Sequence, residues 1–291
     1  MTFNPNADVR GKSATRRGGR GPMIAGGAGV GVIGIAVLLF SLFTGQDLSG
    51  LLGGAPGGGG SEPGTALTNC QTGSDANNDD ACRLDAGEEV INSYWEGEFG
   101  GDYRAPSLVI VDQQAQTPCG TASNQTGPFY CPTDETVYID PTFWSILRGQ
   151  LGAEGGDFAQ LYVLAHEYGH HVQHLTGVFE DHPRDGTGED SNAVRTELQA
   201  DCYAGAWAAE APKQTDAAGQ PYLLEPTRAQ IDDALSAAAA VGDDHIQEQS
   251  GRVNPESWTH GSSEQRQRWF MAGYEGGHAA CDTFAVSGAE L

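Results

Sequence analysis

Apolar residues recur along this 291-residue chain with two different spacings, and each spacing predicts a type of secondary structure. Val90, Ile91, Tyr94 and Trp95 follow the three-to-four-residue period of one helix face. The short β-branched runs SLVIVD and TVYID predict strands instead. The expected strands cover residues 105–112 and 135–140, and the expected helices cover residues 85–99, 141–151, 156–177, 192–210, 225–244 and 262–277. A few early strands followed by several helices predict an α+β fold that is mostly helical with a small sheet.

The longest uncharged apolar run is MIAGGAGVGVIGIAVLLFSLF, residues 23–43. Its 21 residues are close to the ~20 that a helix needs to span a bilayer. Five basic residues precede it, so the positive-inside rule places the N-terminus in the cytoplasm and the rest of the chain outside. A cleaved signal peptide is the alternative, but the run is long for one, and no clear cleavage site follows at once.

These features predict four parts in the chain. A basic cytoplasmic tail (1–22) leads into a transmembrane helix (23–43), a glycine-rich flexible linker (44–66) and one folded domain (67–291). The folded part is long enough to bury a sizeable core. We therefore expect a single-pass protein of the cell membrane whose folded domain is extracytoplasmic.

Charge is distributed unevenly between the two ends of this arrangement. The whole chain carries a formal charge of −24. Residues 1–22 hold five basic residues and one acidic residue, which leaves 10 basic and 38 acidic residues and a net charge of −28 for the remainder. Such an acidic body excludes nucleic acid as a partner. A basic head on an acidic body agrees with a membrane crossing.

All the cysteines follow the apolar run: Cys70, Cys82, Cys119, Cys131, Cys202 and Cys281. An even number of cysteines on the outer side of a membrane predicts disulfides. The spacing favours two short loops, Cys70–Cys82 and Cys119–Cys131, and leaves Cys202–Cys281 as a long-range link. A cysteine-based zinc site is the alternative, but the chain contains no CxxC motif.

The apolar segment LYVLAHEYGHHVQHL contains an HExxH motif made by His166, Glu167 and His170. On a helix, the two imidazoles lie one turn apart and can hold one zinc ion, and the glutamate can reach a water molecule on the metal. His174 is a poor third ligand, because it lies about 12 Å along the helix axis from His166. His171 points away from His170, so a surface or supporting role is expected for both extra histidines.

Glu197, in TELQAD on the next strong helix, is the better third ligand. The residues around it are apolar, so an acid on that face needs a partner. Asp201 lies four residues further on the same face and could accept the free N–H of a ligand histidine. An ordinary exposed pair of acids is the alternative.

Three motifs together resemble the bacterial putative neutral zinc metallopeptidase family: HEYGHHVQ, RTELQADCYAGAWA, and HGSSEQRQRWFMAGYEGG followed by CDTF. The likeness covers most of the chain and implies a zincin-like metallopeptidase domain. HExxH followed by Glu-x-x-x-Asp is similar to the pattern of the gluzincins, which include thermolysin. By that likeness His166, His170 and Glu197 hold zinc, and Glu167 is the general base.

The expected function is a membrane-anchored, zinc-dependent peptidase that cleaves peptide or protein substrates outside the cytoplasmic membrane. Glu167 would take a proton from the attacking water and pass it to the leaving amine. His260 is the candidate donor to the carbonyl oxygen, with a surface or capping role as its alternative; Tyr203 and Arg266 are lesser candidates. The strand TVYID could offer its edge to an extended peptide.

Two other functions are compatible with these residues. A catalytically inactive zinc-binding scaffold or binding protein of the cell envelope would have four protein ligands and no open position. The presence of Glu167 argues against it, because a structural zinc site has no need of a base. A zinc hydrolase acting on a cell-wall amide would use the same site on a different substrate.

Overall fold

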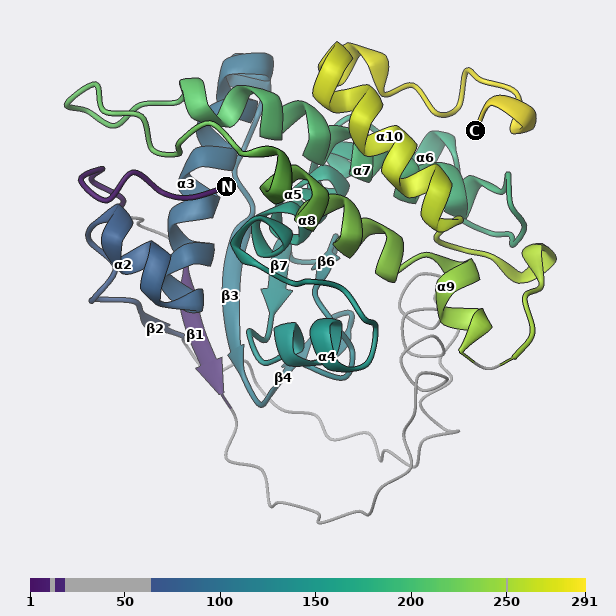
Figure 1. Ribbon diagram of the computed structural model, residues 1–291, viewed down its shortest axis with the longest axis horizontal. Helices are drawn as coiled ribbons and strands as arrows, with labels where there is room; N and C mark the ends of the chain where they lie inside the picture. The colour runs from purple at the N-terminus through teal and green to yellow at the C-terminus, as the bar shows by residue number, and fades with distance from the viewer. Residues whose placement is uncertain (11–13, 19–63, 250) are drawn as a thin grey trace.

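The computed structural model describes residues 1–10, 14–18, 64–249 and 251–291. Helices make up about half of this part and pack around a small sheet, so the α+β prediction is confirmed, with less helix than the mostly helical domain expected (Figure 1). The expected transmembrane helix, residues 23–43, lies outside the described residues. Within the described ranges, no helix is both long and apolar enough to cross a membrane.

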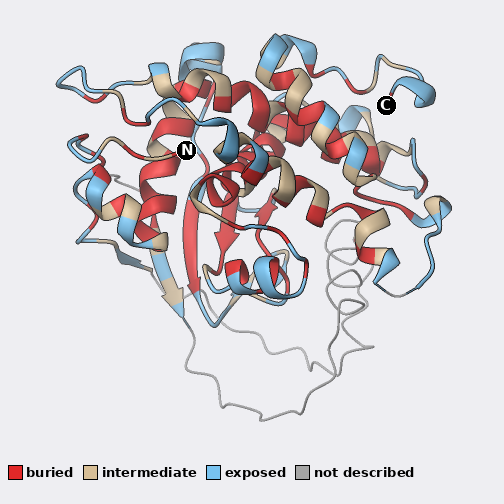
Figure 2. Ribbon diagram, viewed as in Figure 1, coloured by how far each residue is buried: buried red, intermediate tan, exposed pale blue. Residues whose placement is uncertain are grey.

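The main sheet has five strands in the order β2-β1-β3-β7-β6, and a separate hairpin pairs β4 with β5. β3 is parallel to both of its neighbours, whereas β2 and β6 are antiparallel edge strands. The middle of β3 and all of β7 are buried, as expected for β-branched strands covered on both faces (Figure 2). The bounds are β1 (Thr15–Gly18), β2 (Thr65–Ala66), β3 (Ser107–Asp112), β4 (Gln114–Thr117), β5 (Gly120–Ser123), β6 (Phe129–Cys131) and β7 (Thr136–Ile139).

The helices follow the predicted segments closely in most cases. They are α2 (Gly73–Asn78), α3 (Asp80–Phe99), α4 (Phe143–Gly149), α5 (Asp157–Leu175), α6 (Val178–Asp181), α7 (Asn192–Glu210), α8 (Arg228–Ala240), α9 (Asp243–Glu248) and α10 (Ser263–Gly276). Ser262 caps the start of α10, because its side chain accepts a hydrogen bond from the backbone N–H of Gln265 in a capping box.

The single helix expected over residues 225–244 is wrong, because the chain breaks at Gly242 into α8 and α9. Gly242 is extended there and lies against the start of α10. A Cβ at this position would lie 2.6 Å from the backbone nitrogen of Ser263. The close approach of α10 therefore ends α8 at a point that the alanine-rich sequence does not indicate.

α5 is the central helix, and its close contact with α7 depends on the absence of a side chain at Gly169. Residues on nearly all its faces are buried, since α3, α7, α8 and β6 surround it. A Cβ on Gly169 would lie 3.0 Å from the Cα of Ala200 in α7. α7 in turn touches α10 backbone to backbone, because a Cβ on Gly273 would lie 1.8 Å from the carbonyl oxygen of Cys202. These contacts fix α5, α7 and α10 as one unit.

Three disulfides join the pairs that the spacing favours: Cys70–Cys82, Cys119–Cys131 and Cys202–Cys281. The first links the start of α3 to the segment before α2, and the second links the turn of the β4–β5 hairpin to β6. The third ties α7 to the segment that follows α10. The described part of the chain contains no free cysteine.

The first ten residues belong to the folded body, although the sequence assigns them to a separate tail. Met1, Phe3, Ala7 and Val9 are each at most 1% exposed. They join the same hydrophobic core as α3 and α5. β1 extends the main sheet between β2 and β3. The folded domain thus contains residues on both sides of the segment 19–63.

Candidate metal centre

Two histidines on α5 and one glutamate on α7 converge in the interior. The Nε2 atom of His166 lies 3.2 Å from Oε2 of Glu197, and Nε2 of His170 lies 3.5 Å from Oε1 of the same carboxylate. All three side chains are buried. One ligand atom from each lies within 4.8 Å of the other two. The structure therefore brings together the three residues that the sequence predicts as metal ligands.

These three residues fit a zinc ion in chemistry and in spacing. Imidazole nitrogens and a carboxylate oxygen are ligands that zinc takes in catalytic sites. A tetrahedral ion with bonds of about 2.1 Å separates its ligand atoms by about 3.4 Å. The separations of 3.2 and 3.5 Å agree with that value.

Hydrogen bonds fix the ligand histidines in the tautomer that a metal requires. Nδ1 of His166 lies 2.8 Å from Oδ1 of Asp201, and Nδ1 of His170 lies 2.8 Å from Oε1 of Gln173. Both oxygens accept only, so each Nδ1 donates and each Nε2 keeps its lone pair for the metal. The structure places Asp201 in the supporting position that the sequence predicts.

Asp201 is itself held from three directions and has no exposed surface. Arg266 on α10 donates to it through Nε at 2.7 Å and through a second nitrogen at 2.9 Å. The hydroxyl of Tyr162 donates to it at 2.5 Å. Such bidentate pairing compensates a buried carboxylate for its lost hydration. Arg266 therefore positions Asp201, which in turn orients His166.

Buried charges shift the pKa values of these groups in opposite directions. Burial lowers the pKa of His166, but the charge and hydrogen bond of Asp201 outweigh it and raise that pKa to about 10, so a metal ion would replace a proton on Nε2. Burial raises the pKa of Glu197, but His170 and His166 hold it well below its usual range. Burial likewise opposes the lowered pKa of Asp201, which Arg266 and His166 produce. The carboxylates thus stay ionised, as metal ligation and its support require.

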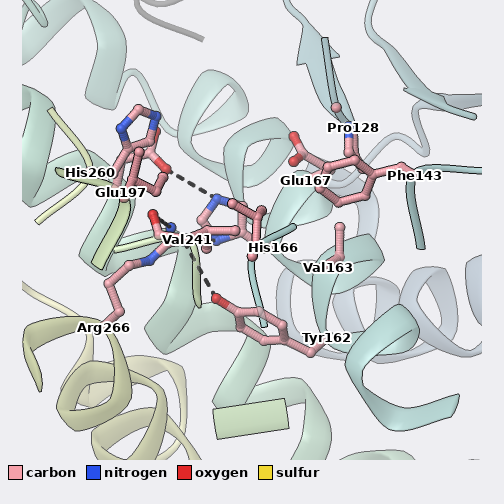
Figure 3. A pocket seen from close by; sticks show the side chains of 13 residues that line it. Pro128, Phe143, Tyr162, Val163, His166, Glu167, Glu197, Val241, His260 and Arg266 are labelled. Atoms are coloured by element: carbon pink, nitrogen blue, oxygen red, sulfur yellow. Dashed lines mark hydrogen bonds and ion pairs between the residues drawn. The ribbon is translucent and has the colours of Figure 1, made fainter. Parts of the chain in front are cut away.

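Glu167 lies next to the ligands and faces a pocket with largely apolar walls. Figure 3 shows it beside Pro128 and Phe143, on the other side of His166 from Glu197. Its Oε2 atom is buried and has no hydrogen-bond partner among the described residues. Burial raises its pKa above the ordinary value for glutamate, which suits a general base.

His260 lines the same pocket, and a buried aspartate holds it. Oδ2 of Asp243 accepts the backbone N–H groups of Thr259, His260 and Gly261, at 2.7, 2.6 and 3.0 Å. Its Oδ1 atom lies 3.3 Å from Nδ1 of His260. Burial lowers the pKa of His260, but Asp243 outweighs it and raises that pKa above its ordinary value. Asp243 thus favours the protonated, hydrogen-bond-donating form of this ring at the pocket.

Comparison with known families gives this arrangement a context. A family model described as "putative neutral zinc metallopeptidase" matches residues 4–284. The chain belongs to this family. The resemblance inferred from the three motifs is therefore confirmed.

Relatives in this zinc metallopeptidase family come from distant bacteria. Uncharacterized protein Rv2575 of Mycobacterium tuberculosis is 49% identical over 229 residues, which cover 77% of this chain and 78% of the relative. Uncharacterized protein YpfJ of Escherichia coli K12 is 39% identical over 282 residues, which cover 93% and 91%. No solved structure matches the chain.

Two further histidines of α5, His171 in the family motif and His174 just after it, do not reach the metal centre. His171 is fully buried, not at the surface, and its ring bonds the carbonyl of Arg104 at 2.6 Å and the hydroxyl of Tyr130 at 3.0 Å. His174 bonds the same hydroxyl at 2.7 Å and stacks on Phe179. Both connect α5 to neighbouring segments.

The two lesser candidates for a donor also have other contacts. Tyr203 packs edge-on against Trp95, with their ring centroids 5.4 Å apart, and it is absent from the lining of the pocket. Arg266 does line the pocket, but Asp201 binds its guanidinium. This leaves His260 as the candidate with a ring in the pocket.

Sequence reasoning missed two charged residues near the site in this member of the family. Asp243 falls at the end of the helix expected over residues 225–244, where no motif marks it. Arg184, between α6 and α7, lies 4.6 Å above the ring of Phe179. Burial lowers its pKa, whereas the charges of Glu197 and Glu167 raise it. Neither residue stands in a motif, so only the folded arrangement identifies them.

Proposed function

We propose that this chain is a zinc-dependent peptidase that hydrolyses peptide bonds outside the cytoplasm, with a water molecule as nucleophile and Glu167 as general base. The observation that carries the proposal is the convergence of three buried ligands beside a buried, pocket-facing glutamate. Three donors leave a position for water, whereas a purely structural zinc site fills all four with protein ligands.

His166, His170 and Glu197 would hold a zinc ion, which would supply the Lewis acidity that polarises the scissile carbonyl and lowers the pKa of water toward about 7. Glu167 accepts a proton from the attacking water as the new carbon–oxygen bond forms. It then delivers that proton to the amine nitrogen as the carbon–nitrogen bond breaks. His260, whose protonated form Asp243 favours, donates a hydrogen bond to the carbonyl oxygen as negative charge develops on it.

The walls of the pocket indicate how a peptide would bind. β7 was expected to offer its edge, but β3 and β6 pair with it on both sides, so β6 is the edge strand next to the site. The backbone N–H of Tyr130 in β6 bonds the Glu167 carboxylate. Pro128, Phe143 and Val163 line the cavity. An extended peptide along β6 with an apolar side chain in the pocket is the substrate these features suit.

The three disulfides support a location outside the cytoplasm, because such bonds persist in oxidising compartments. This argument for the location is independent of which substrate the protein cleaves.

The decisive experiment compares Glu167→Gln with Glu154→Gln, an exposed glutamate on the segment before α5. Zinc content of the full chain is measured by mass spectrometry, and a peptide library is digested with and without a chelator. We expect Glu167→Gln to keep its zinc and lose about 10²- to 10⁴-fold in cleavage rate, and Glu154→Gln to match the parent. Cleavage by Glu167→Gln at the parent rate would refute the mechanism.

The same experiment separates the alternatives. A scaffold holds zinc but cleaves no library peptide in any variant. A cell-wall amidase leaves the peptide library intact and cleaves purified peptidoglycan in a manner that depends on Glu167.

A further inference from the structure

The first ten residues form an arm that packs against the catalytic domain, and α2 lies on one side of it. The backbone N–H of Phe3 donates to Oδ1 of Asn77 at 3.0 Å, and the Asn77 amide returns a bond to the Phe3 carbonyl at 2.9 Å. The N–H of Gly73 donates to the carbonyl of Ala7 at 3.0 Å. These bonds satisfy the backbone of a segment that has no helix or sheet of its own.

On its other side, the arm contacts residues 222–224, which lead into α8. The N–H of Asn4 donates to the carbonyl of Tyr222, and the N–H of Leu224 donates to the carbonyl of Thr2, both at 2.9 Å. Gln230 on α8 donates to the hydroxyl of Thr2 at 2.8 Å. The arm is thus bound from two elements that are far apart in sequence.

At Gly73, the backbone of α2 lies in close contact with the arm. A Cβ on Gly73 would lie 1.9 Å from the carbonyl oxygen of Asn4, a distance that no side chain tolerates. Gly97 on α3 offers a contrast, since a Cβ there meets nothing within 4 Å. Close packing of the arm thus requires glycine at position 73.

The arm continues into the main sheet on the far side of residues 11–13. β1 pairs in parallel with β3, where Thr15 lies opposite Val109. It also pairs antiparallel with β2, where Thr15 lies opposite Ala66. The two ends of the segment 19–63 therefore start and finish on adjacent strands of one sheet.

This adjacency conflicts with a single membrane crossing. One crossing between residues 19 and 63 would separate β1 from β2 by the thickness of a bilayer, about 30 Å. The sequence of that segment contains one apolar run of spanning length and no second one. An even number of crossings would need two.

We propose that residues 1–10 and 14–18 dock on the catalytic domain of their own chain and lie on the same side of the membrane as that domain. This placement replaces the cytoplasmic tail that charge distribution alone predicts. The arm shares a hydrophobic core with the metal helix. Asp233 of α8 accepts the N–H groups of Gly156 and Ala159 at the start of α5, and its charge acts on the α-amine of the buried Met1. One carboxylate thus faces both the arm and the start of the helix that carries the ligand histidines.

The first test compares two exposed positions in the full chain, Asn6→Cys on the arm and Ser145→Cys on α4. Intact cells are treated with a membrane-impermeant maleimide, and the labelled fraction is measured before and after permeabilisation. We expect both cysteines to be labelled alike. Labelling of Ser145→Cys with protection of Asn6→Cys until the cells are permeabilised would overturn the proposal. Protection of both would support it and contradict only the extracytoplasmic location.

The second test detects docking directly. Asp8 and Thr72 are opposite residues in an isolated antiparallel bridge, so cysteines at these positions are close enough for a disulfide. In membranes that carry the Asp8→Cys, Thr72→Cys chain, peptide mapping should find an intrachain 8–72 bond. Adding Gly73→Ala should abolish it, and adding Gly97→Ala should leave it unchanged. A bond found only between chains, or reactive thiols that never join, would sink the proposal.

Discussion

The two pairs of histidines on α5 share one helix but differ in what faces them. His166 meets the carboxylates of Glu197 and Asp201 on α7. His170 meets Glu197 and, through Nδ1, the amide oxygen of Gln173 one turn later on α5. His171 and His174 meet the hydroxyl of Tyr130 and a backbone carbonyl. Spacing along a helix gives a histidine its direction, and the neighbouring element decides whether it can hold a metal.

The pKa values of His166 and His171, five residues apart on α5, show the same contrast. Asp201 raises the pKa of His166 to about 10 against the opposing effect of burial, whereas burial lowers the pKa of His171 to about 4. A carboxylate partner thus keeps an imidazole able to carry or exchange charge. A neutral partner leaves it a packing residue with two hydrogen bonds.

The largest effect should come from His170→Gln. Loss of one ligand leaves two, so we expect zinc binding to weaken by more than ~100-fold, the upper range for a supporting residue alone, and peptide cleavage to disappear. Zinc titration with a competing chelator measures the affinity. If this variant bound zinc as tightly as the parent, His170 would not be a metal ligand.

His260→Ala tests whether a histidine outside α5 behaves like the first pair. Its partner Asp243 is a buried carboxylate, so we expect it to serve the reaction rather than the packing. Loss of an oxyanion donor lowers kcat by about 10²- to 10³-fold. Zinc content should stay unchanged, and a parent-like kcat would assign the ring to structure alone.

Asp201→Asn removes the charge that distinguishes His166 from His171. The amide can turn its nitrogen toward Nδ1 and favour the wrong tautomer, so we expect a loss of about 10- to 100-fold in zinc affinity. The measurement is the same chelator titration, with Asp232→Asn, on an exposed face of α8, as the matched control. Equal affinity in the two variants would contradict the role of Asp201.

His171→Phe should lower stability and leave the metal untouched. The change strips a partner from the Arg104 carbonyl and from the Tyr130 hydroxyl, at a cost of about 1–3 kcal/mol in the free energy of unfolding. Denaturant unfolding measures the stability, and mass spectrometry measures the zinc. If the folded His171→Phe protein lost its zinc, His171 would have to be counted as part of the metal site.

His174→Gln should have the smallest effect. The ring is partly exposed, and glutamine can keep a bond to Tyr130, so the unfolding free energy should change by no more than ~0.5 kcal/mol. Zinc affinity and cleavage rate should equal those of the parent. A tenfold drop in zinc affinity or in cleavage rate would show that His174 belongs to the site.

The signals by which the sequence singles out His166, His170 and Glu197 are local. HExxH fixes two ligands by helical period, and Glu197 is conspicuous as an acid on an apolar helix face. The same helical period gave α7 its observed bounds, Asn192–Glu210. Here local pattern and tertiary packing require the same residues.

The features that prediction missed depend on contacts between distant segments. The break at Gly242 follows from the approach of α10, and the burial of Asp243 follows from that break. The N-terminal arm reads as a polar, basic tail, since its burial depends on backbone bonds to α2 and to the segment near Tyr222. No period or motif within residues 1–10 encodes those partners.

The bare backbone at Gly169 has a consequence for how closely the three candidate ligands approach one another. A methyl group there would press on Ala200 and force α7 outward by a few tenths of an ångström. Glu197 would retreat with its helix, and its carboxylate oxygens would leave the separations of 3.2 and 3.5 Å that suit zinc. The fit of these ligands to an ion thus depends on a residue outside the ligand set.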